Sequence, residues 1–442
     1  MKYLYSLKSA NGKIDIKEVK SSRDITKFIV FPNSLYIGNK SYVPSLLMDE
    51  RENLTPGKNP AYEYCDARMF MAYRGNTAVG RVLAIHNKRF NSLWNRKCIR
   101  FSRFDVIEDF EVAKALIDAV EKWAEELGMN EVQGPMGFCD LDKEGLLVDG
   151  FDERGMFITA YNHKYYGEFI ERLGYSKIAD WVEREIKVPD TLDPRIEKIA
   201  EYSLKKTGLH MLDIKKAKDI LPYADGIFEV LEEAYRDLYG VIPLNEKQTK
   251  MYLNQFITLV RPEFIAVILD KNDRVVSFGV AVPSMAEAVK KCGGKILPFG
   301  WVPLLKYFTS KHCDIIEFLL IGTRREYWGD AVNANIMTKV FYGAKKYNVK
   351  FAETGPMLET NFRIHSMWKR FENRAHNAAV VMRKSLTGQA LTNISETRNF
   401  SRAEIKIENC LYSCFFRAFI SACRFFHMFV CIFQNGGGKR KT

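Results

Sequence analysis

A long internal repeat constrains the fold of this chain more than any other feature of its sequence. The tripeptide Gly-Pro-Met occurs at residues 134–136 and again at 355–357, which is 221 positions later (355 − 134 = 221). When the two copies are aligned by this offset, the helical patterns before the motifs align without a gap, and Met337 falls on Leu116. Solenoid repeats are far shorter. The pattern therefore predicts two copies of one domain; the alternative is that two α/β domains share the pattern by chance.

Each copy contains the same order of predicted elements, namely a β-hairpin, a strand, a helix and a second strand. In the first hairpin, two apolar runs flank Gly75 and Asn76, which favour a turn. The helix of the first copy has apolar residues at helical spacing and ends at Gly128, as a C-terminal cap would. We therefore predict an α/β fold of two tandem domains, each with a mixed central β-sheet flanked by helices. The elements are hairpin 70–87, strand 99–107, helix 111–128 and strand 131–136 in the first copy, and hairpin 264–282, strand 314–322, helix 331–348 and strand 349–357 in the second.

The domain ranges follow from the repeat. A length of 442 residues corresponds to about two to three domains. We assign residues 1–190 to the N-terminal domain, which opens with one strand and a loop over residues 1–24. The segment 188–209 carries two prolines and then a charged helix, and we assign residues 191–215 to the connection. Residues 216–385 form the C-terminal domain. Residues 386–442 are a polar linker followed by a tail rich in Phe and Cys.

The charge balance of the chain favours anionic partners. Sixty-six Lys and Arg residues against 54 Asp and Glu give a net charge of +12. Such a surface attracts phosphates, nucleic acid or acidic lipid headgroups. No predicted helix carries a stripe of Lys and Arg, so we predict no nucleic-acid partner.

The cysteines form neither a metal motif nor a disulfide framework in the sequence. Four of the nine lie within residues 410–431, and the other five show no CxxC pair. We interpret those five as buried free thiols of a reducing compartment. The N-terminus lacks the continuous apolar run of a signal peptide, so we predict a cytoplasmic protein. Because the cysteines and histidines form no metal motif, we also predict no bound metal. The five scattered cysteines are Cys65, Cys98, Cys139, Cys292 and Cys313.

The C-terminal run 410–433 differs in composition from the rest of the chain. As a helix it would carry two serines, two arginines and a histidine as one polar stripe beside a Phe-rich face. An arginine near the middle of a spanning helix costs about 2.5 to 3.5 kcal/mol on insertion scales, which favours a position in the membrane interface over crossing. Three interpretations are open: peripheral contact with the inner face of the membrane, packing on the body of the protein, and an extension outside the native fold.

In the second copy, the apolar strand ends in a short loop that opens the next helix. Gly329 and Ala331 are small enough there for backbone N–H groups to approach a ligand, and a helix N-terminus favours an anion. Arg324 and Arg325 add positive charge beside the loop. These residues predict a pyrophosphate site, and a plain turn is the alternative.

A family resemblance rests on these motifs. The order of elements, the loop with Gly329 and Ala331, and the helix that begins at Asn361 together resemble the GNAT superfamily of acyl-CoA-dependent acyltransferases, present twice in this chain. The segments GPMGFCDLDKEGLLVDGFD and YNHKYYGEFIERLGY resemble a bacterial family of GNAT-like N-acyltransferases, to which bacterial ceramide synthases are similar. The resemblance covers about residues 25–385.

The resemblance implies that the second copy binds acyl-CoA. Asn361 matches the asparagine that opens the last helix of the fold, and it is a candidate catalytic residue. Two positions depart from the pattern: Glu326 stands where Gln or Arg is expected, and Trp368 stands where many members have a tyrosine acid. In the first copy, residues 108–111 (Glu-Asp-Phe-Glu) replace the phosphate loop, and their carboxylates repel a pyrophosphate. The candidate acyl-CoA-binding residues are Leu320, Ile321, Arg324, Arg325, Gly329 and Ala331.

An acidic loop in the first copy is the candidate acceptor site. Residues 140–152 hold five carboxylates around an apolar Leu-Leu-Val run, and carboxylates in such a place can hold an amine and accept its proton. We expect the base to be Glu144 or Glu353, which lies on a strand whose other residues look buried. A solvated loop, core tyrosines and a structural ion pair of Glu353 are the alternatives. The candidate acceptor-binding residues are Asp149, Asp152, Asn162 and Tyr166.

The function expected from these patterns is acyl transfer from the thioester of acyl-CoA to an amine, without a metal. On the family resemblance, the amine acceptor is a long-chain sphingoid base, as for a ceramide synthase. Two alternatives are open: an acetyltransferase for a small soluble amine, and a GNAT-fold protein without activity that binds a ligand or partner. Glu326 and Trp368 are the sequence support for the second alternative.

Overall fold

The computed structural model describes residues 4–257 and 259–387, which belong to one compact unit. The predicted tail, from residue 388 onward, lies outside the described residues, so its three interpretations stay open. Within the described ranges, no helix combines the length and the apolar composition that crossing a membrane requires.

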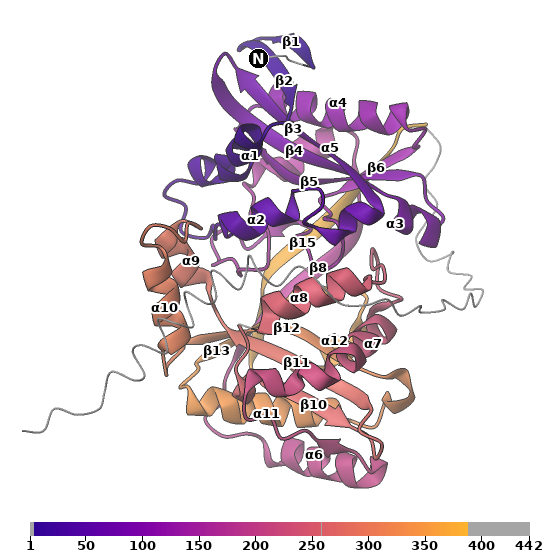
Figure 1. Cartoon of the computed structure of the whole chain (residues 1–442), viewed down its shortest axis with the longest axis vertical. Coiled ribbons are helices and arrows are strands. Elements are labelled where there is room, and N and C mark those ends of the chain that lie inside the picture. Colours follow the sequence, from indigo (N-terminus) through magenta and orange to yellow (C-terminus); the bar gives the residue numbers. More distant parts are fainter. Residues whose placement is uncertain (1–3, 258, 388–442) are drawn as a thin grey trace, which may run out of the picture. The chain divides into compact units, whose positions relative to one another are not determined.

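One sheet of fifteen strands runs through the described part of the chain, and helices flank it (Figure 1). The predicted class, a mixed β-sheet with helices in two tandem copies, is confirmed. From one edge to the other, the strand order is β1, β2, β3, β4, β5, β6, β15, β8, β13, β12, β11, β10 and β9. Two short strands lie off this path, because β14 pairs with β8 and β7 pairs with β15.

The first half of the unit runs from β1 to β8. Its hairpin, strand, helix and strand follow the predicted order, as β3, β4, β5, α4 and β6. The opening segment was predicted as one strand and a loop; it forms two strands, because Gly12 adopts a φ of +98° that closes a tight turn between them. The elements are β1 (Tyr5–Ser9), β2 (Gly12–Glu18), α1 (Ser22–Leu35), α2 (Leu47–Asn53), a 3₁₀ turn (Pro60–Glu63), β3 (Cys65–Arg74), β4 (Thr77–Asn87), α3 (Lys88–Leu93), β5 (Cys98–Val106), α4 (Phe110–Glu126), β6 (Glu131–Gly134), β7 (Leu146–Asp149), α5 (Tyr165–Arg172) and β8 (Ser176–Lys187).

The second half runs from α6 to β15 and repeats the order with β10, β11, β12, α11 and β13. It also contains helices α7, α8, α9 and α10, which the sequence did not predict. Glycines and prolines between and within α9 and α10 interrupt the helical pattern there. The elements are α6 (Pro194–Thr207), β9 (His210–Met211), a 3₁₀ turn (Ala217–Tyr223), α7 (Ala224–Tyr235), α8 (Glu246–Ile257), a 3₁₀ turn (Pro262–Phe264), β10 (Ile265–Leu269), β11 (Val275–Pro283), α9 (Ala286–Cys292), α10 (Trp301–Thr309), β12 (Ile315–Thr323), a 3₁₀ turn (Arg325–Tyr327), α11 (Asn333–Lys346), β13 (Phe351–Thr354), β14 (Met357–Leu358), α12 (Phe362–Trp368) and β15 (Asn373–Ser385).

The equivalent helices α4 and α11 show why the repeat is visible in the sequence. Leu116 and Val120 are fully buried in α4, where they contact the sheet of the first half. At the aligned positions in α11, Met337 contacts the core of the second half and Phe341 is also buried. Each helix therefore needs the same apolar stripe.

The two halves exchange their last strands. Strand β8 of the first half pairs with β13 of the second, and β15 of the second half pairs with β6 of the first. The two exchanged strands also pair with each other in antiparallel register, with Ala379 opposite Trp181, and they run side by side in Figure 1. The domain ranges 1–190 and 216–385 stay a prediction, and neither range contains the strand that completes its own half of the sheet.

In each half, two parallel neighbours pair only over a short length. Strands β5 and β6 pair from Cys98 to Arg100, and β12 and β13 pair from Ile315 to Phe318. Strand β12 then continues to Thr323, whereas the chain after β13 turns to pair with β8. The end of β12 is therefore left without a partner strand on this side, among the strands described.

Candidate active site

The loop between β12 and α11 has the backbone geometry of an anion site. Gly329 and Ala331 adopt left-handed φ values of +98° and +56°, and no side chain caps the N-terminus of α11. A Cβ atom added to Gly329 would meet nothing within 4 Å, so the loop faces open space there. Left-handed residues before an uncapped helix direct backbone N–H groups toward a common point, which favours an anion.

The equivalent helix of the first half has lost this property. The carboxylate of Asp109 caps α4 by accepting hydrogen bonds from the backbone N–H groups of Glu111 (3.0 Å) and Val112 (3.4 Å). Its other oxygen pairs with Arg74 at 2.6 Å. Burial opposes ionisation of Asp109, but hydrogen bonds from Arg74 and Asn11 outweigh it and lower the pKa of the carboxyl. The anion site of α4 is therefore filled by the chain's own carboxylate.

The two arginines predicted beside the loop of the second half are held by acidic residues around α7. Buried Arg324 pairs with Glu229 at 2.8 Å and with Glu233 at 3.1 Å. Arg325 pairs with Asp237. Their charge is neutralised within the protein, so the anion site depends on the backbone N–H groups of the loop.

The free edge of β12 is contacted by a tyrosine that the sequence did not single out. The hydroxyl of Tyr235, the last residue of α7, donates to the carbonyl oxygen of Ile321 at 3.1 Å and lies 3.5 Å from its N–H group. Burial raises the pKa of Tyr235 to about 12. Leu320 and Ile321 are half-buried on this edge, where the sequence predicted the acyl thioester.

Two carboxylates of the acidic loop, Asp140 and Glu144, each have one buried oxygen without a hydrogen bond. Burial raises the pKa of Asp140 to about 6, and burial together with the charge of Asp140 raises the pKa of Glu144 well above its ordinary value. The acidic loop packs against the second half, because the sulfur of Cys139 lies 3.1 Å from the hydroxyl of Tyr252 on α8. The charge of Asp140 also contributes to the raised pKa of Tyr235.

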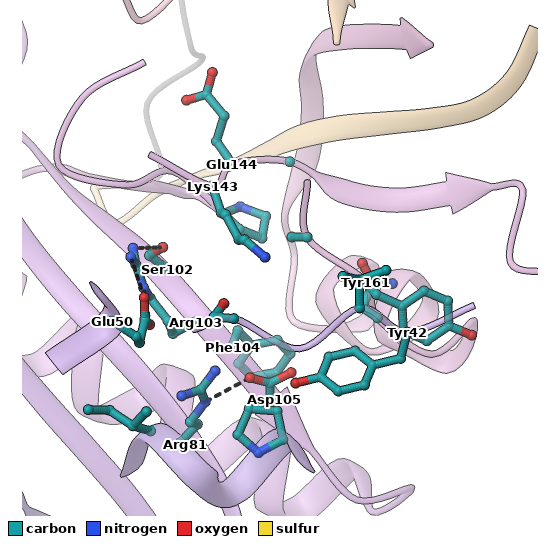
Figure 2. Close-up of a pocket in the computed structure, with 18 of the residues that line it drawn as sticks. Tyr42, Glu50, Arg81, Ser102, Arg103, Phe104, Asp105, Lys143, Glu144 and Tyr161 are labelled. Carbon is teal, nitrogen blue, oxygen red and sulfur yellow. Dashed lines mark hydrogen bonds and ion pairs between the residues drawn. The ribbon is translucent and has the colours of Figure 1, made fainter. Parts of the chain in front are cut away.

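A cavity of about 80 Å³ lies on the other side of the same loop, against β5 (Figure 2). One wall is an ion network in which Arg103 pairs with Asp142 at 2.7 Å and with Glu50 at 3.0 Å. In Figure 2 the ammonium of Lys143 points into this space, whereas the carboxylate of Glu144 points away from it. Burial lowers the pKa of Lys143 to about 8.

Glu353, the second candidate base, lies in a row of buried carboxylates on adjacent strands. It pairs with Arg154 of the first half at 2.7 Å, and Arg154 also donates to Ser284, which donates to Glu317 at 2.6 Å. Burial raises the pKa of Glu353, and burial raises the pKa values of Glu317 and Glu183 to about 7. The structure therefore gives Glu353 the ion pair that the sequence left as an alternative, while its second oxygen has no hydrogen-bond partner.

The remaining predicted residues have structural contacts of their own. Asn162 is buried and bonds both the N–H and the C=O of Leu147, and Tyr166 is buried with its hydroxyl bonded to the backbone of Val106. Asp149 and Asp152 are exposed and are absent from the lining of the cavity.

Two features of the last helix also have structural roles. The Asn361 side chain caps α12. Trp368 is buried against Phe318.

Two predictions, one about metals and one about thiols, concern the described residues. No cluster of His, Cys, Asp and Glu in residues 4–257 and 259–387 could hold a metal ion. The five cysteines in this part of the chain are free thiols. Cys65, Cys98 and Cys139 are buried as predicted, whereas Cys292 and Cys313 are partly exposed.

Comparison with solved structures identifies the architecture. A tandem GNAT protein from the clavulanic acid biosynthesis pathway superposes on 85% of this chain and 99% of its own, with a TM-score of 0.51 and 10% sequence identity. The fold is therefore a tandem GNAT fold. A GCN5-related glucosamine N-acetyltransferase region of a fungal multi-domain β-N-acetylglucosaminidase matches 84% of this chain and 38% of that chain, with a TM-score of 0.50 and 11% identity.

Two curated proteins are similar in sequence, and no family model matches the chain. Protein YghO of Escherichia coli is 24% identical over 363 residues, which cover 80% of this tandem GNAT chain and 91% of YghO. The bacterial ceramide synthase of Caulobacter vibrioides is 27% identical over 323 residues, which cover 72% of this chain and 83% of the synthase.

Proposed function

We propose that this protein is an acyl-CoA-dependent N-acyltransferase whose second half binds acyl-CoA and whose first half supplies the acceptor side. The difference between the two equivalent helices carries the proposal. The N-terminus of α11 is open behind two left-handed residues, whereas the N-terminus of α4 is occupied by Asp109.

In this proposal the donor lies along the end of β12. The pyrophosphate of CoA accepts hydrogen bonds from the backbone of the loop at Gly329 and Ala331. The thioester lies beside Leu320 and Ile321, where β12 has no partner strand. The N–H group of Ile321, which contacts the Tyr235 hydroxyl at 3.5 Å in the absence of a ligand, polarises the carbonyl oxygen once the thioester is bound. Polarisation makes the carbonyl carbon more electrophilic.

The acceptor amine approaches from the acidic loop of the first half. Only a neutral amine attacks a thioester, so a carboxylate must remove its proton. Glu144 suits this step, because a buried oxygen without a donor and a raised pKa make it a better base than an exposed carboxylate. Glu353 is the second candidate, although Arg154 occupies one of its oxygens.

The CoA thiolate leaves after the attack, and the Tyr235 hydroxyl is our candidate donor to it. Tyr235 touches the same backbone edge at Ile321 that would hold the thioester. Trp368 stands where family members place a tyrosine, but an indole is only a weak hydrogen-bond donor, and here it is buried and directed at Met357.

The acceptor in this proposal is a long-chain amine of the sphingoid class, and the compartment is the cytoplasm. The name of the Caulobacter relative supports the acceptor class, and the free thiols support a reducing compartment.

A direct assay tests the activity. The purified full chain is mixed with palmitoyl-CoA and sphinganine, CoA thiol release is followed, and the amide is identified by mass spectrometry. We expect equal amounts of thiol and amide. Thiol release with hexylamine or spermidine but not with sphinganine would replace the acceptor class, and no release with any acyl-CoA would favour a binding protein.

A further inference from the structure

The two halves also differ in the connection between the hairpin and the strand that follows it. In the first half this connection spans residues 88–97, and in the second half it spans residues 284–314. The longer connection forms α9 and α10, which pack on each other and lie together at one side of the molecule in Figure 1. The second half therefore carries an added helical hairpin, which we call the α9–α10 hairpin.

The tip of this hairpin exposes large apolar side chains. Leu297 is 74% exposed and Phe299 is 76% exposed, and Val302 and Phe308 follow on α10 with exposed side chains. A contiguous exposed apolar patch in a globular protein marks a surface that contacts a partner or a membrane. Trp301 is partly exposed beside them, and its indole donates to the carbonyl of Pro298. An aromatic ring of this kind is typical of a membrane–water interface.

Basic residues outnumber acidic ones in this connection. Residues 284–314 contain five lysines, one glutamate and one aspartate, a balance of 5 − 2 = +3. Lys291, Lys295, Lys306 and Lys311 are exposed, and none of these four has an ion pair among the described residues. An apolar tip on a hairpin with exposed lysines suits an anionic lipid surface. There, aromatic side chains enter the acyl boundary and ammonium groups contact the headgroups.

We propose that the α9–α10 hairpin docks this protein on the surface of an anionic lipid bilayer. This inference goes beyond the proposed acyl transfer and does not depend on it. The apolar tip enters the interface, the lysines contact phosphate groups, and no segment of the hairpin crosses the bilayer.

The connection between α9 and α10 is fixed, where it leaves α9, to residues that line the cavity of the first half. Asn33 donates to the carbonyl of Gly293 at 3.1 Å, and the N–H of Leu47 donates to the carbonyl of Gly294 at 3.0 Å. Both Asn33 and Leu47 line the cavity, and so does Val43, which packs into the core of the hairpin. A protein docked through this hairpin therefore has the cavity next to the lipid surface, which suits a lipid ligand.

Vesicle flotation tests the proposal with the full chain. Phosphatidylcholine vesicles with and without one third phosphatidylglycerol are mixed with wild type and with the double variant Leu297→Ser/Phe299→Ser. We expect wild type to float with the anionic vesicles and the variant to float about tenfold less, because two apolar side chains no longer enter the lipid. The melting temperature should not fall, because both side chains are exposed.

Two further variants separate this surface from a general effect. Ile37→Ser/Tyr202→Ser is the matched control, because these side chains are 80% and 67% exposed outside the hairpin, and it should float like wild type. Lys291→Gln/Lys295→Gln should lose binding to anionic vesicles in proportion to the charge removed.

Three outcomes would overturn the proposal. Wild type that does not float excludes the lipid surface. A Leu297→Ser/Phe299→Ser variant that floats like wild type moves the contact to another segment. If sedimentation shows a wild-type dimer that this variant breaks, while flotation is unchanged, the occupant of the tip is a second copy of the chain.

Discussion

The two halves of this molecule share one fold and differ at the N-terminus of one helix. In α4, Asp109 accepts the N–H groups of Glu111 and Val112 and is held by Arg74. In α11, the equivalent N–H groups follow Gly329 and Ala331 in left-handed conformations, and no side chain caps them. Asp330 stands at the position aligned with Asp109 (330 − 109 = 221), but its carboxylate pairs with Lys206 at 2.8 Å and does not cap the helix. The partner of one carboxylate therefore separates a helix stabilised by its own anion from one that is open to an external anion.

This difference shows how a duplicated domain divides its tasks. The first half keeps the sheet, the diverging strands and the helix, all of which the core requires. The residue that caps its helix can change, because a side-chain cap leaves the fold intact. The cap only prevents an external anion from binding at the helix N-terminus. The first half then contributes Arg154, which pairs with Glu353 on β13, and in the proposed function it also contributes Glu144.

The largest effect is expected from a substitution that blocks the anion site in the loop between β12 and α11. Gly329→Glu places a carboxylate at the anion site, which repels pyrophosphate, so turnover should fall by at least about a hundredfold with no saturation by acyl-CoA. Steady-state kinetics and circular dichroism measure this. Gly57→Glu is the matched control, because Gly57 also has a left-handed φ (+80°) and open space around it. Equal loss in both variants would point to backbone strain instead.

Removing the candidate base should have the next largest effect. Glu144→Gln keeps the shape of the side chain and removes proton acceptance, so kcat should fall about a hundredfold while acyl-CoA affinity is unchanged. Asp149→Asn, on the exposed part of the same loop, should leave kcat unchanged. If Glu353→Gln lowers kcat and Glu144→Gln does not, the base belongs to the second half, and the division of tasks is wrong.

A buried carboxyl group on the exchanged strand β8 should make the stability of the protein depend on pH. Glu183 on β8 accepts a hydrogen bond from Asn377 on β15 at 3.0 Å, and burial, with the charges of Glu353 and Glu317, raises its pKa to about 7. Because the folded state binds this proton more tightly than the unfolded chain, stability is lost as pH rises from about 4.3 toward 7. Glu183→Gln should therefore stabilise the protein by about 2 kcal/mol at pH 8 and have little effect near pH 4.

Urea unfolding at both pH values measures this difference. Glu185→Gln is the matched control on the same strand, because its carboxylate pairs with Arg374 at 2.9 Å and carries no unpaired buried charge. A Glu183→Gln variant that is less stable than wild type at pH 8 would contradict the raised pKa of Glu183.

The smallest effect is expected from uncapping α4. Asp109→Ala should lower the free energy of unfolding by about 1 kcal/mol, the usual value of an N-cap. Asp193→Ala, at the N-cap of α6, should cost a similar amount and serves as the control. Neither variant should change turnover, because neither cap belongs to the donor site of the second half.

The sequence predicted the architecture because the repeat follows the core. The apolar spacing of α4 and α11 and the Gly-Pro-Met motifs mark positions that every copy of the fold must keep. The exchange of β8 and β15 was not predicted, because an apolar strand pattern does not specify which neighbour it pairs with.

The site was predicted only in part, for a related reason. Glu353 is buried as the sequence suggested, but its partner, Arg154, comes from a segment 199 residues away. Arg324 and Arg325 seemed free for a phosphate, and only the fold shows the carboxylates of Glu229, Glu233 and Asp237 beside them. Contacts of this length leave no local pattern in a sequence.

Calorimetric titration of the full chain with CoA tests the central claim most directly, because the stoichiometry counts the open helix N-termini. The account predicts one CoA per chain, a site that Gly329→Glu removes and that Asp109→Ala leaves unchanged. Two CoA molecules per chain, or one that persists in Gly329→Glu and disappears in Asp109→Ala, would contradict it.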